Sequence, residues 1–150
     1  MWGISPLELQ VSAMVLESGK VQQIWGIATD GRAAIEATRR GLPISTVDEL
    51  VDSGRLSLAE IDRIVLPRKT LAHRRAIGAL TPDQSDRLMR VVRVVAAAEN
   101  TFGSLEKAHR WLRRPTTALE GDAPLALLDT SEGSRQVELL LARIDHGLAA

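Results

Sequence analysis

The residues of this chain best suited to chemistry are cations, and their densest run lies near the middle of the sequence. No acidic residue interrupts the segment from Arg68 to Ala79. Guanidinium and ammonium groups bind phosphate oxygens, while hydroxyl and imidazole groups reach phosphates or base edges. The sequence therefore predicts a DNA-binding segment. Its candidate contact residues are Arg68, Lys69, Thr70, His73, Arg74 and Arg75.

The formal net charge of zero conceals an uneven distribution of charge along the chain. Lys and Arg number 4 against 7 Asp and Glu in residues 1–54, 13 against 6 in residues 55–114, and 2 against 6 in residues 115–150. A basic middle between acidic ends is typical of a nucleic-acid-binding module flanked by protein-binding parts. Arginines that only solvate the outer faces of helices would give the same balance, so both interpretations stay open at this point.

A second group of residues suits contact with a protein. Trp and Arg are enriched among the residues that dominate binding energy at interfaces. A turn from Pro115 to Pro124 would present its side chains to a partner. The alternatives are a core position for Trp111 and a favourable charge at a helix end for Arg113 and Arg114. The candidate partner-binding residues are Trp111, Arg113, Arg114, Pro115, Leu119, Glu120, Asp122 and Leu125.

The residue inventory argues against an enzyme. The three histidines are scattered outside any H-x-x-x-H spacing, and there is no cysteine to serve as a nucleophile or a zinc ligand. No G-x-G-x-x-G or G-x-x-x-x-G-K-[ST] loop offers a cradle for a nucleotide. We therefore expect no catalytic residue, no metal site and no cofactor.

Two capping boxes show where the central helices begin. In Ser57–Glu60 and in Thr81–Gln84, the first side chain can cap an orphan amide while the last reaches back to the cap residue. Between these starts, Leu66-Pro67 separates two short helical patterns, and two short helices across a tight break resemble a helix-turn-helix. The second of them carries the cations, and its Leu71 is expected to face inward.

The apolar pattern over residues 81–102 predicts the longest helix of the chain. We expect it to pack against the modules on both sides of it and to fix their relative orientation. A shorter helix is predicted over residues 104–113, and Pro115 ends it because the residue before a proline leaves the helical region. A last helix is expected to begin with Thr130 or Ser131 as its cap.

The amino-terminal part is the least readable. Residues 1–31 have no clean periodicity, whereas residues 32–40 and 45–53 have helical patterns, each followed by a glycine. This part would be either a dimerisation element or additional core. No signal-peptide pattern is visible, and no apolar run approaches the roughly 20 residues that span a bilayer. With no cysteine present, a soluble cytoplasmic protein is expected.

Together these patterns predict an all-α protein with a central helix-turn-helix followed by a small helical domain. The expected divisions are an amino-terminal helical segment over residues 1–54, a helix-turn-helix module with a long connecting helix over 55–102, and a partner-binding domain over 103–150. A chain of 150 residues is long enough to bury a hydrophobic core within such helical modules.

Three runs near the carboxyl end carry a resemblance to a known family: E-K-A-H-R-W-L-R-R-P, P-L-A-L-L-D-T-S-E-G and V-E-L-L-L-A-R-I-D-H-G. In order and spacing they resemble the toxin-binding domain of Xre/MbcA/ParS-type antitoxins. In the central module, Arg68, Thr70, Leu71, Arg74 and Arg75 match the helix-turn-helix region of that family. Its members are partners of RES-domain toxins, so the resemblance implies that this chain neutralises an NAD-consuming enzyme.

The resemblance implies a type II antitoxin in which the region from Trp111 to Asp129, with the terminal helix, covers the toxin's substrate entrance. It also implies a homodimer within a larger toxin–antitoxin complex, bound to operator DNA near its own gene. Two alternatives remain. One is a stand-alone helix-turn-helix transcriptional regulator whose carboxy-terminal domain only dimerises, and the other is an inhibitor with a vestigial helix-turn-helix.

Overall fold

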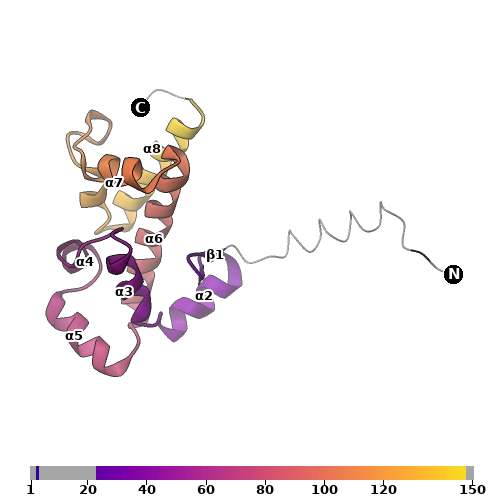
Figure 1. The fold of residues 1–150 in the computed structure, drawn as a ribbon, viewed down its shortest axis with the longest axis vertical. Coiled ribbons are helices and arrows are strands. Elements are labelled where there is room, and N and C mark those ends of the chain that lie inside the picture. The colour runs from indigo at the N-terminus through magenta and orange to yellow at the C-terminus, as the bar shows by residue number, and fades with distance from the viewer. Residues whose placement is uncertain (1–2, 4–22, 148–150) are drawn as a thin grey trace.

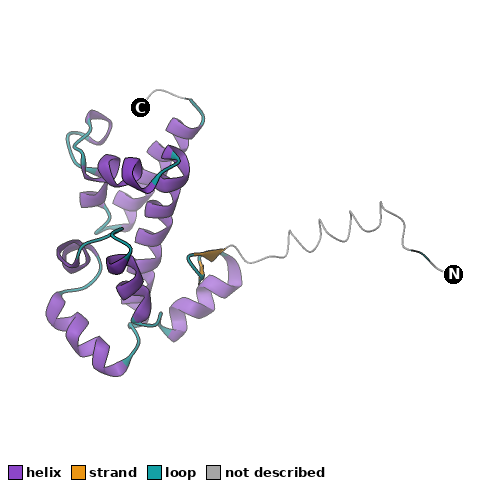
Figure 2. Ribbon diagram, in the orientation of Figure 1, coloured by secondary structure: helices purple, strands orange, loops and turns teal. Residues whose placement is uncertain are grey.

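The computed structural model describes Gly3 and residues 23–147. Most of the described chain is helical, which confirms the predicted all-α class (Figure 2). Most of residues 1–31, in which no clean periodicity was found, lie outside the described residues. In chain order the elements are β1 (Gln23–Ile24), β2 (Ile27–Ala28), α2 (Gly31–Arg40), α3 (Ser45–Asp52), α4 (Leu58–Ile64), α5 (Arg68–Ile77), α6 (Pro82–Phe102), α7 (Leu105–Arg113), the short 3₁₀ helices η1 (Thr117–Leu119) and η2 (Pro124–Leu127), and α8 (Ser131–Asp145).

Helix α6 is the element around which the others pack. It runs along the middle of the molecule, with α3, α4 and α5 toward one of its ends and α7 and α8 toward the other (Figure 1). Helices α2, α7 and α8 all contact it. This arrangement agrees with the expectation that the long helix orients the parts before and after it. Its buried apolar residues are Leu88, Met89, Val91, Val92, Val94, Val95 and Ala98.

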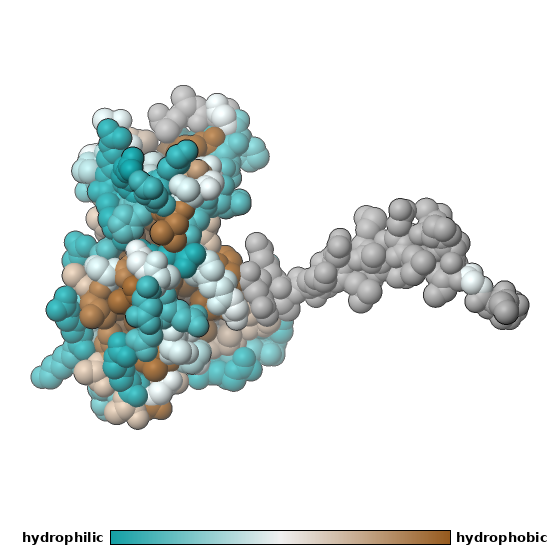
Figure 3. Space-filling view, viewed as in Figure 1, coloured by the Kyte–Doolittle hydropathy of each residue, from teal (hydrophilic) through white to brown (hydrophobic). Residues whose placement is uncertain are grey.

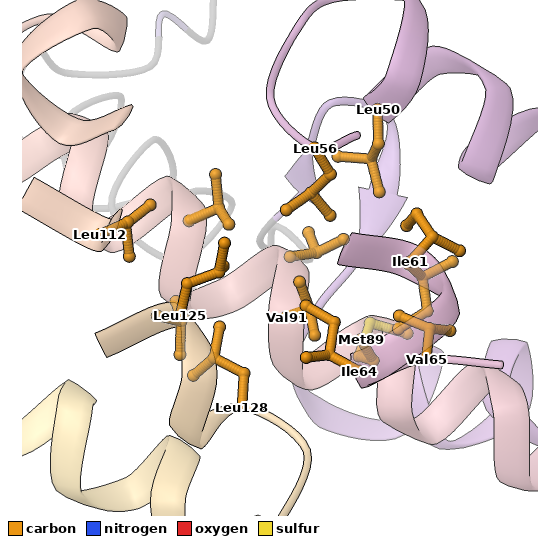
Figure 4. Packing of buried hydrophobic residues seen from close by; sticks show 14 of the residues in the cluster. Leu50, Leu56, Ile61, Ile64, Val65, Met89, Val91, Leu112, Leu125 and Leu128 are labelled. Atoms are coloured by element: carbon orange, nitrogen blue, oxygen red, sulfur yellow. The ribbon is translucent and has the colours of Figure 1, made fainter. Parts of the chain in front are cut away.

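One hydrophobic cluster joins the two ends of the molecule (Figure 4). Its members come from α3, α4 and α5, from α6, and from α7, α8 and the segment between them. Each of the residues labelled in the figure is at most 6 % exposed: Leu50, Leu56, Ile61, Ile64, Val65, Met89, Val91, Leu112, Leu125 and Leu128. The core is therefore continuous across the helix-turn-helix and the carboxy-terminal helices.

Hydrophilic residues cover most of the surface on the face shown in Figure 3. Hydrophobic residues are most visible over the part of this face that carries α3, α4 and α5. Isolated exposed apolar side chains are ordinary on folded proteins. The large exposed ones among the described residues are Ile35, Leu58, Ile77, Leu105 and Leu139.

Residues 23–28 form a small hairpin that the sequence patterns did not predict. Its strands are antiparallel and pair Ile24 with Ile27. Trp25 and Gly26 form the turn, with φ of 49° and 78°, and two positive φ values are the geometry that tight hairpins favour. A non-glycine residue rarely adopts positive φ. The guanidinium of Arg55 lies 4.1 Å from the Trp25 ring centroid and helps to hold the turn in place.

Candidate functional site

The helix-turn-helix predicted in the centre of the chain is present in the fold. Only residues 65–67 separate α4 from α5. The capping box at the start of α4 is formed, since Ser57 Oγ accepts the Glu60 N–H at 3.1 Å and Glu60 Oε1 accepts the Ser57 N–H at 3.2 Å. Asp62 Oδ1 accepts the N–H of Arg68 at 2.7 Å. The first helix therefore supplies a cap for the second and fixes its start.

Helix α5 presents part of the predicted DNA-contact set to solvent. Leu71 is 4 % exposed and packs into the core as expected, which determines the face that α5 turns outward. Within residues 23–147, Arg68 and Lys69 have no ion-pair partner, so their charges are available to phosphates. The exposed members of the predicted set are Arg68, Lys69, His73 and Arg75, while Thr70 and Arg74 are half-buried.

Two arginines of the predicted set contact the protein itself. Arg74 Nε donates to the carbonyl oxygen of Ala79 at 2.8 Å, beyond the end of α5. Arg75 Nη2 lies 2.7 Å from Asp48 Oδ1 of α3, and both side chains of that pair are partly exposed. Sequence alone did not distinguish the four basic residues of this set from one another. In the structure Arg74 has a structural contact, and the charge of Arg75 is paired with that of Asp48 in a partly exposed ion pair.

The carboxy-terminal candidate residues lie around the segment between α7 and α8. The 3₁₀ helices η1 and η2 pack against α8 and turn Leu119 and Leu125 inward, which leaves them 8 % and 5 % exposed. The expectation that these two leucines face a partner is therefore corrected, because the tight turns direct them to the core. The residues of the predicted set with exposed side chains are Arg114, Pro115, Glu120 and Asp122.

The segment between α7 and α8 has a defined backbone. The Thr116 N–H donates to the Asp122 carbonyl at 3.2 Å, and the Gly121 N–H donates to the Thr116 carbonyl at 2.9 Å. Glu120 has a φ of 57° and lies at the tip between these bonds. A loop cross-linked by its own backbone loses little conformational freedom on binding.

Trp111 combines the two alternatives predicted for it, a core position and a contact with a partner. Its side chain is half-buried, and its ring centroid lies 5.3 Å from that of Phe102 with the planes tilted by 42°. This distance and tilt are typical of an aromatic pair. Trp111 therefore packs on the end of α6 and still contributes part of its surface to the outside.

Arg113 connects the carboxy-terminal part to the helix-turn-helix. Its Nη2 donates to the carbonyl oxygen of Arg55 at 3.0 Å and lies 3.0 and 2.9 Å from the two carboxylate oxygens of Glu60. Its Nη1 donates to the carbonyl oxygen of His109 at 3.0 Å. The Glu60 side chain is 11 % exposed, so the guanidinium neutralises a nearly buried carboxylate.

Arg55 is an organising residue that the sequence patterns did not identify. Its Nε lies 3.0 Å from Glu99 Oε2 and its Nη2 donates to Glu99 Oε1 at 3.0 Å, a bidentate pair with α6. The same guanidinium covers Trp25 of the hairpin. These partners are far from Arg55 in sequence, and no local spacing marks them.

Helix α8 begins with a persistent negative charge. Side-chain hydrogen bonds from Arg135 and then Gln136 lower the pKa of Glu132 to about 2, although the side chain is exposed. The acidic side chain in the first turn also suits the helix dipole.

Within residues 23–147, no group of three or more metal-ligating side chains is arranged to hold a metal ion. None of the helices in this part of the chain combines the length and the apolar character needed to cross a membrane.

Comparison with known proteins matches both halves of this architecture. Residues 33–93 match the family described as the antitoxin Xre-like helix-turn-helix domain, and residues 97–147 match the antitoxin Xre/MbcA/ParS C-terminal toxin-binding domain. Antitoxin Xre of Pseudomonas putida is 38 % identical over 108 residues, which are 71 % of this chain and 67 % of that protein. The chain belongs to the Xre antitoxin family.

Two other relatives of this antitoxin extend the comparison. Antitoxin Xre of Yersinia enterocolitica is 32 % identical over 124 residues, which are 81 % of this chain and 84 % of that protein. The Prs ADP-ribosylating antitoxin of a Sphingobium species is 34 % identical over 80 residues, 47 % of this chain and 50 % of that protein. The chain is thus an antitoxin of a toxin–antitoxin system that combines an Xre-like helix-turn-helix domain with a toxin-binding domain.

Proposed function

We propose that this antitoxin neutralises a RES-domain toxin that degrades NAD, by covering the entrance to the toxin's active site. The observation that carries the proposal is the ordered loop between α7 and α8, which lies inside the matched toxin-binding domain and exposes Arg114, Pro115, Glu120 and Asp122. No catalytic group of the antitoxin is required, because occupation of the entrance alone blocks the substrate. The name of the Sphingobium relative refers to ADP-ribosylation, a reaction class that uses NAD as donor.

The residues predicted to bind the toxin divide into two groups: some contact the toxin directly, and the others support the contact surface from within the antitoxin. Arg114, Pro115, Glu120 and Asp122 touch the toxin together with the exposed part of Trp111. Leu119, Leu125 and Arg113 support that surface from inside the antitoxin. The proposed units are residues 1–54 for dimerisation, 55–102 for DNA and 103–150 for the toxin, although the shared core makes them fold together.

An assay of NAD consumption tests the toxin half of the proposal. The product of the gene adjacent to that of the antitoxin, which the proposal expects to be a RES-domain toxin, is mixed with the wild-type antitoxin or with Arg114→Asp, and NAD is measured over time. Reversal of an exposed charge at an interface centre is expected to weaken inhibition about tenfold or more. Arg87→Asp, the same change at an exposed arginine of α6, is the control and should inhibit normally. Equal inhibition by both variants would contradict the proposed surface, and consumption of NAD despite the wild-type antitoxin would contradict the proposed function.

We further propose that a homodimer binds operator DNA in the cytoplasm and represses its own gene. The matched helix-turn-helix domain and the two uncompensated cations at the start of α5 support this. The internal contacts of Arg74 and Arg75 favour a second candidate, a toxin inhibitor whose helix-turn-helix has become mainly a scaffold.

The salt dependence of DNA binding separates these candidates. Lys69→Ala is expected to reduce the slope of log affinity against log salt by about 0.9, because one phosphate contact is lost. Arg74→Ala should leave the slope unchanged and lower the free energy of unfolding by about 1 kcal/mol, because its hydrogen bond to Ala79 is structural. Fluorescence anisotropy on operator DNA at several salt concentrations gives the slopes, and thermal unfolding gives the stability. The scaffold candidate would gain support if the wild type bound DNA at no salt concentration.

A further inference from the structure

A groove of about 380 Å³ separates the first helix of the helix-turn-helix from the segment that follows α7. Ala59 and Arg63 of α4 line one side, and Ala123, Leu125 and Ala126 line the other. A space of this size accommodates a few side chains. The exposed methyl groups of Ala59 and Ala126 leave the groove open, because neither side chain is large enough to fill it.

The groove carries an excess of positive charge. Glu60 and Arg113 also line it, but they form an ion pair with each other at 2.9 Å and leave no net charge. Arg63 is exposed and has no ion-pair partner within residues 23–147. One uncompensated guanidinium therefore remains beside small apolar side chains, which suits a ligand that combines a carboxylate with apolar surface.

We propose that this groove binds an acidic segment of the toxin, with Arg63 as the partner of a toxin carboxylate; the inference rests on the proposed function. A DNA phosphate would also pair with Arg63, but a phosphodiester backbone offers little apolar surface to bury against Ala59, Ala123 and Ala126. An acidic protein segment offers both a carboxylate and apolar surface. The toxin then contacts the first helix of the helix-turn-helix as well as the carboxy-terminal domain, and its footprint crosses the boundary between the two matched regions.

Two substitutions in α4 test the groove while the sequence of the carboxy-terminal domain stays unchanged. Arg63→Glu reverses the charge, and Ala59→Phe fills the space. The matched controls are Arg87→Glu, at an exposed arginine of α6 with no ion-pair partner among the described residues, and Ala72→Phe, at an exposed alanine of α5; neither position lines the groove. The probe is the product of the gene adjacent to that of the antitoxin, expected under the proposed function to be a RES-domain toxin, and it is titrated against each full-length antitoxin by calorimetry. Thermal unfolding of each free variant establishes that it is folded.

We expect Arg63→Glu and Ala59→Phe each to weaken toxin binding about tenfold or more, while both controls bind the toxin within about twofold of the wild type. Operator affinity is measured in parallel. If Arg63→Glu lost DNA affinity beyond the loss in Arg87→Glu and kept toxin affinity, the groove would belong to the DNA backbone and the inference would be overturned. Toxin binding by Ala59→Phe at wild-type strength would overturn it as well. A wild-type antitoxin that did not bind this toxin would instead reject the proposed function.

Discussion

Replacement of Arg113 by alanine is expected to lower the free energy of unfolding by about 2–3 kcal/mol. Removal of one partner of a buried ion pair costs about 3–5 kcal/mol, because the other charge is left without compensation. Arg113 and Glu60 are not fully buried, with side chains 26 % and 11 % exposed, so part of that cost is relieved by water. The Arg113 hydrogen bond to the carbonyl oxygen of Arg55 is lost as well. Chemical denaturation followed by circular dichroism measures the change.

The neighbouring arginine is the matched control. Arg114 is exposed and has no ion-pair partner within residues 23–147, so Arg114→Ala should change the free energy of unfolding by less than about 0.5 kcal/mol. A double variant in which Glu60 is also replaced by glutamine should recover part of the loss, because no uncompensated charge then remains. Equal stabilities for Arg113→Ala and Arg114→Ala would show that the contact with Glu60 contributes nothing.

This ion pair has a consequence beyond stability. Arg113 precedes the exposed loop proposed to contact the toxin, whereas Glu60 caps the first helix of the helix-turn-helix. The side chains that position the two binding surfaces are therefore in direct contact. Because the hydrophobic cluster is also continuous, we expect unfolding in a single transition rather than in separate steps for two domains.

The parts of the fold that could be predicted from the sequence are those that local chemistry decides. The capping boxes of α4 and α6 are formed with the predicted partners, and Gly103, with a φ of 72°, follows the last residue of α6 as its C-cap. Pro115 ends α7 near the expected place. A cap, a proline or a glycine acts on residues within one turn of itself, so its effect is visible in a short stretch of sequence.

The parts that could not be predicted depend on partners distant in the chain. Arginine is a residue type that is common at binding interfaces, yet the guanidinium of Arg113 contacts Glu60, 53 positions earlier in the chain. Leu119 is in a turn rich in polar residues, and only the packing of η1 against α8 shows that it faces inward. Arg74 and Lys69 are both basic residues of one helix, but Arg74 is half-buried and bonded to Ala79 whereas Lys69 is exposed. Side-chain direction and long-range pairing decided each of these cases.

The second large effect is expected from Gly133→Ala in the first turn of α8. A Cβ atom at this position would overlap with the carbonyl oxygen of Leu127 and would lie 2.8 Å from its carbonyl carbon. Both atoms belong to the backbone at the end of η2, so no side-chain rotation relieves the overlap. Alanine has a helix propensity about 1 kcal/mol better than that of glycine, which would stabilise an open helical site. Here the overlap dominates, and a net loss of about 2–3 kcal/mol is expected.

Thermal unfolding and toxin binding together check this effect. A loss of that size should lower Tm by about 5–10 °C in a chain of this length. Glu138→Ala, on the exposed face of the same helix, is the control and should leave Tm nearly unchanged. Because relief of the overlap must move η2 or the start of α8, the loop that they anchor is displaced, and inhibition of the toxin should weaken even where the variant is fully folded. An unchanged Tm for Gly133→Ala would mean that α8 and η2 are not packed as closely as the structure places them.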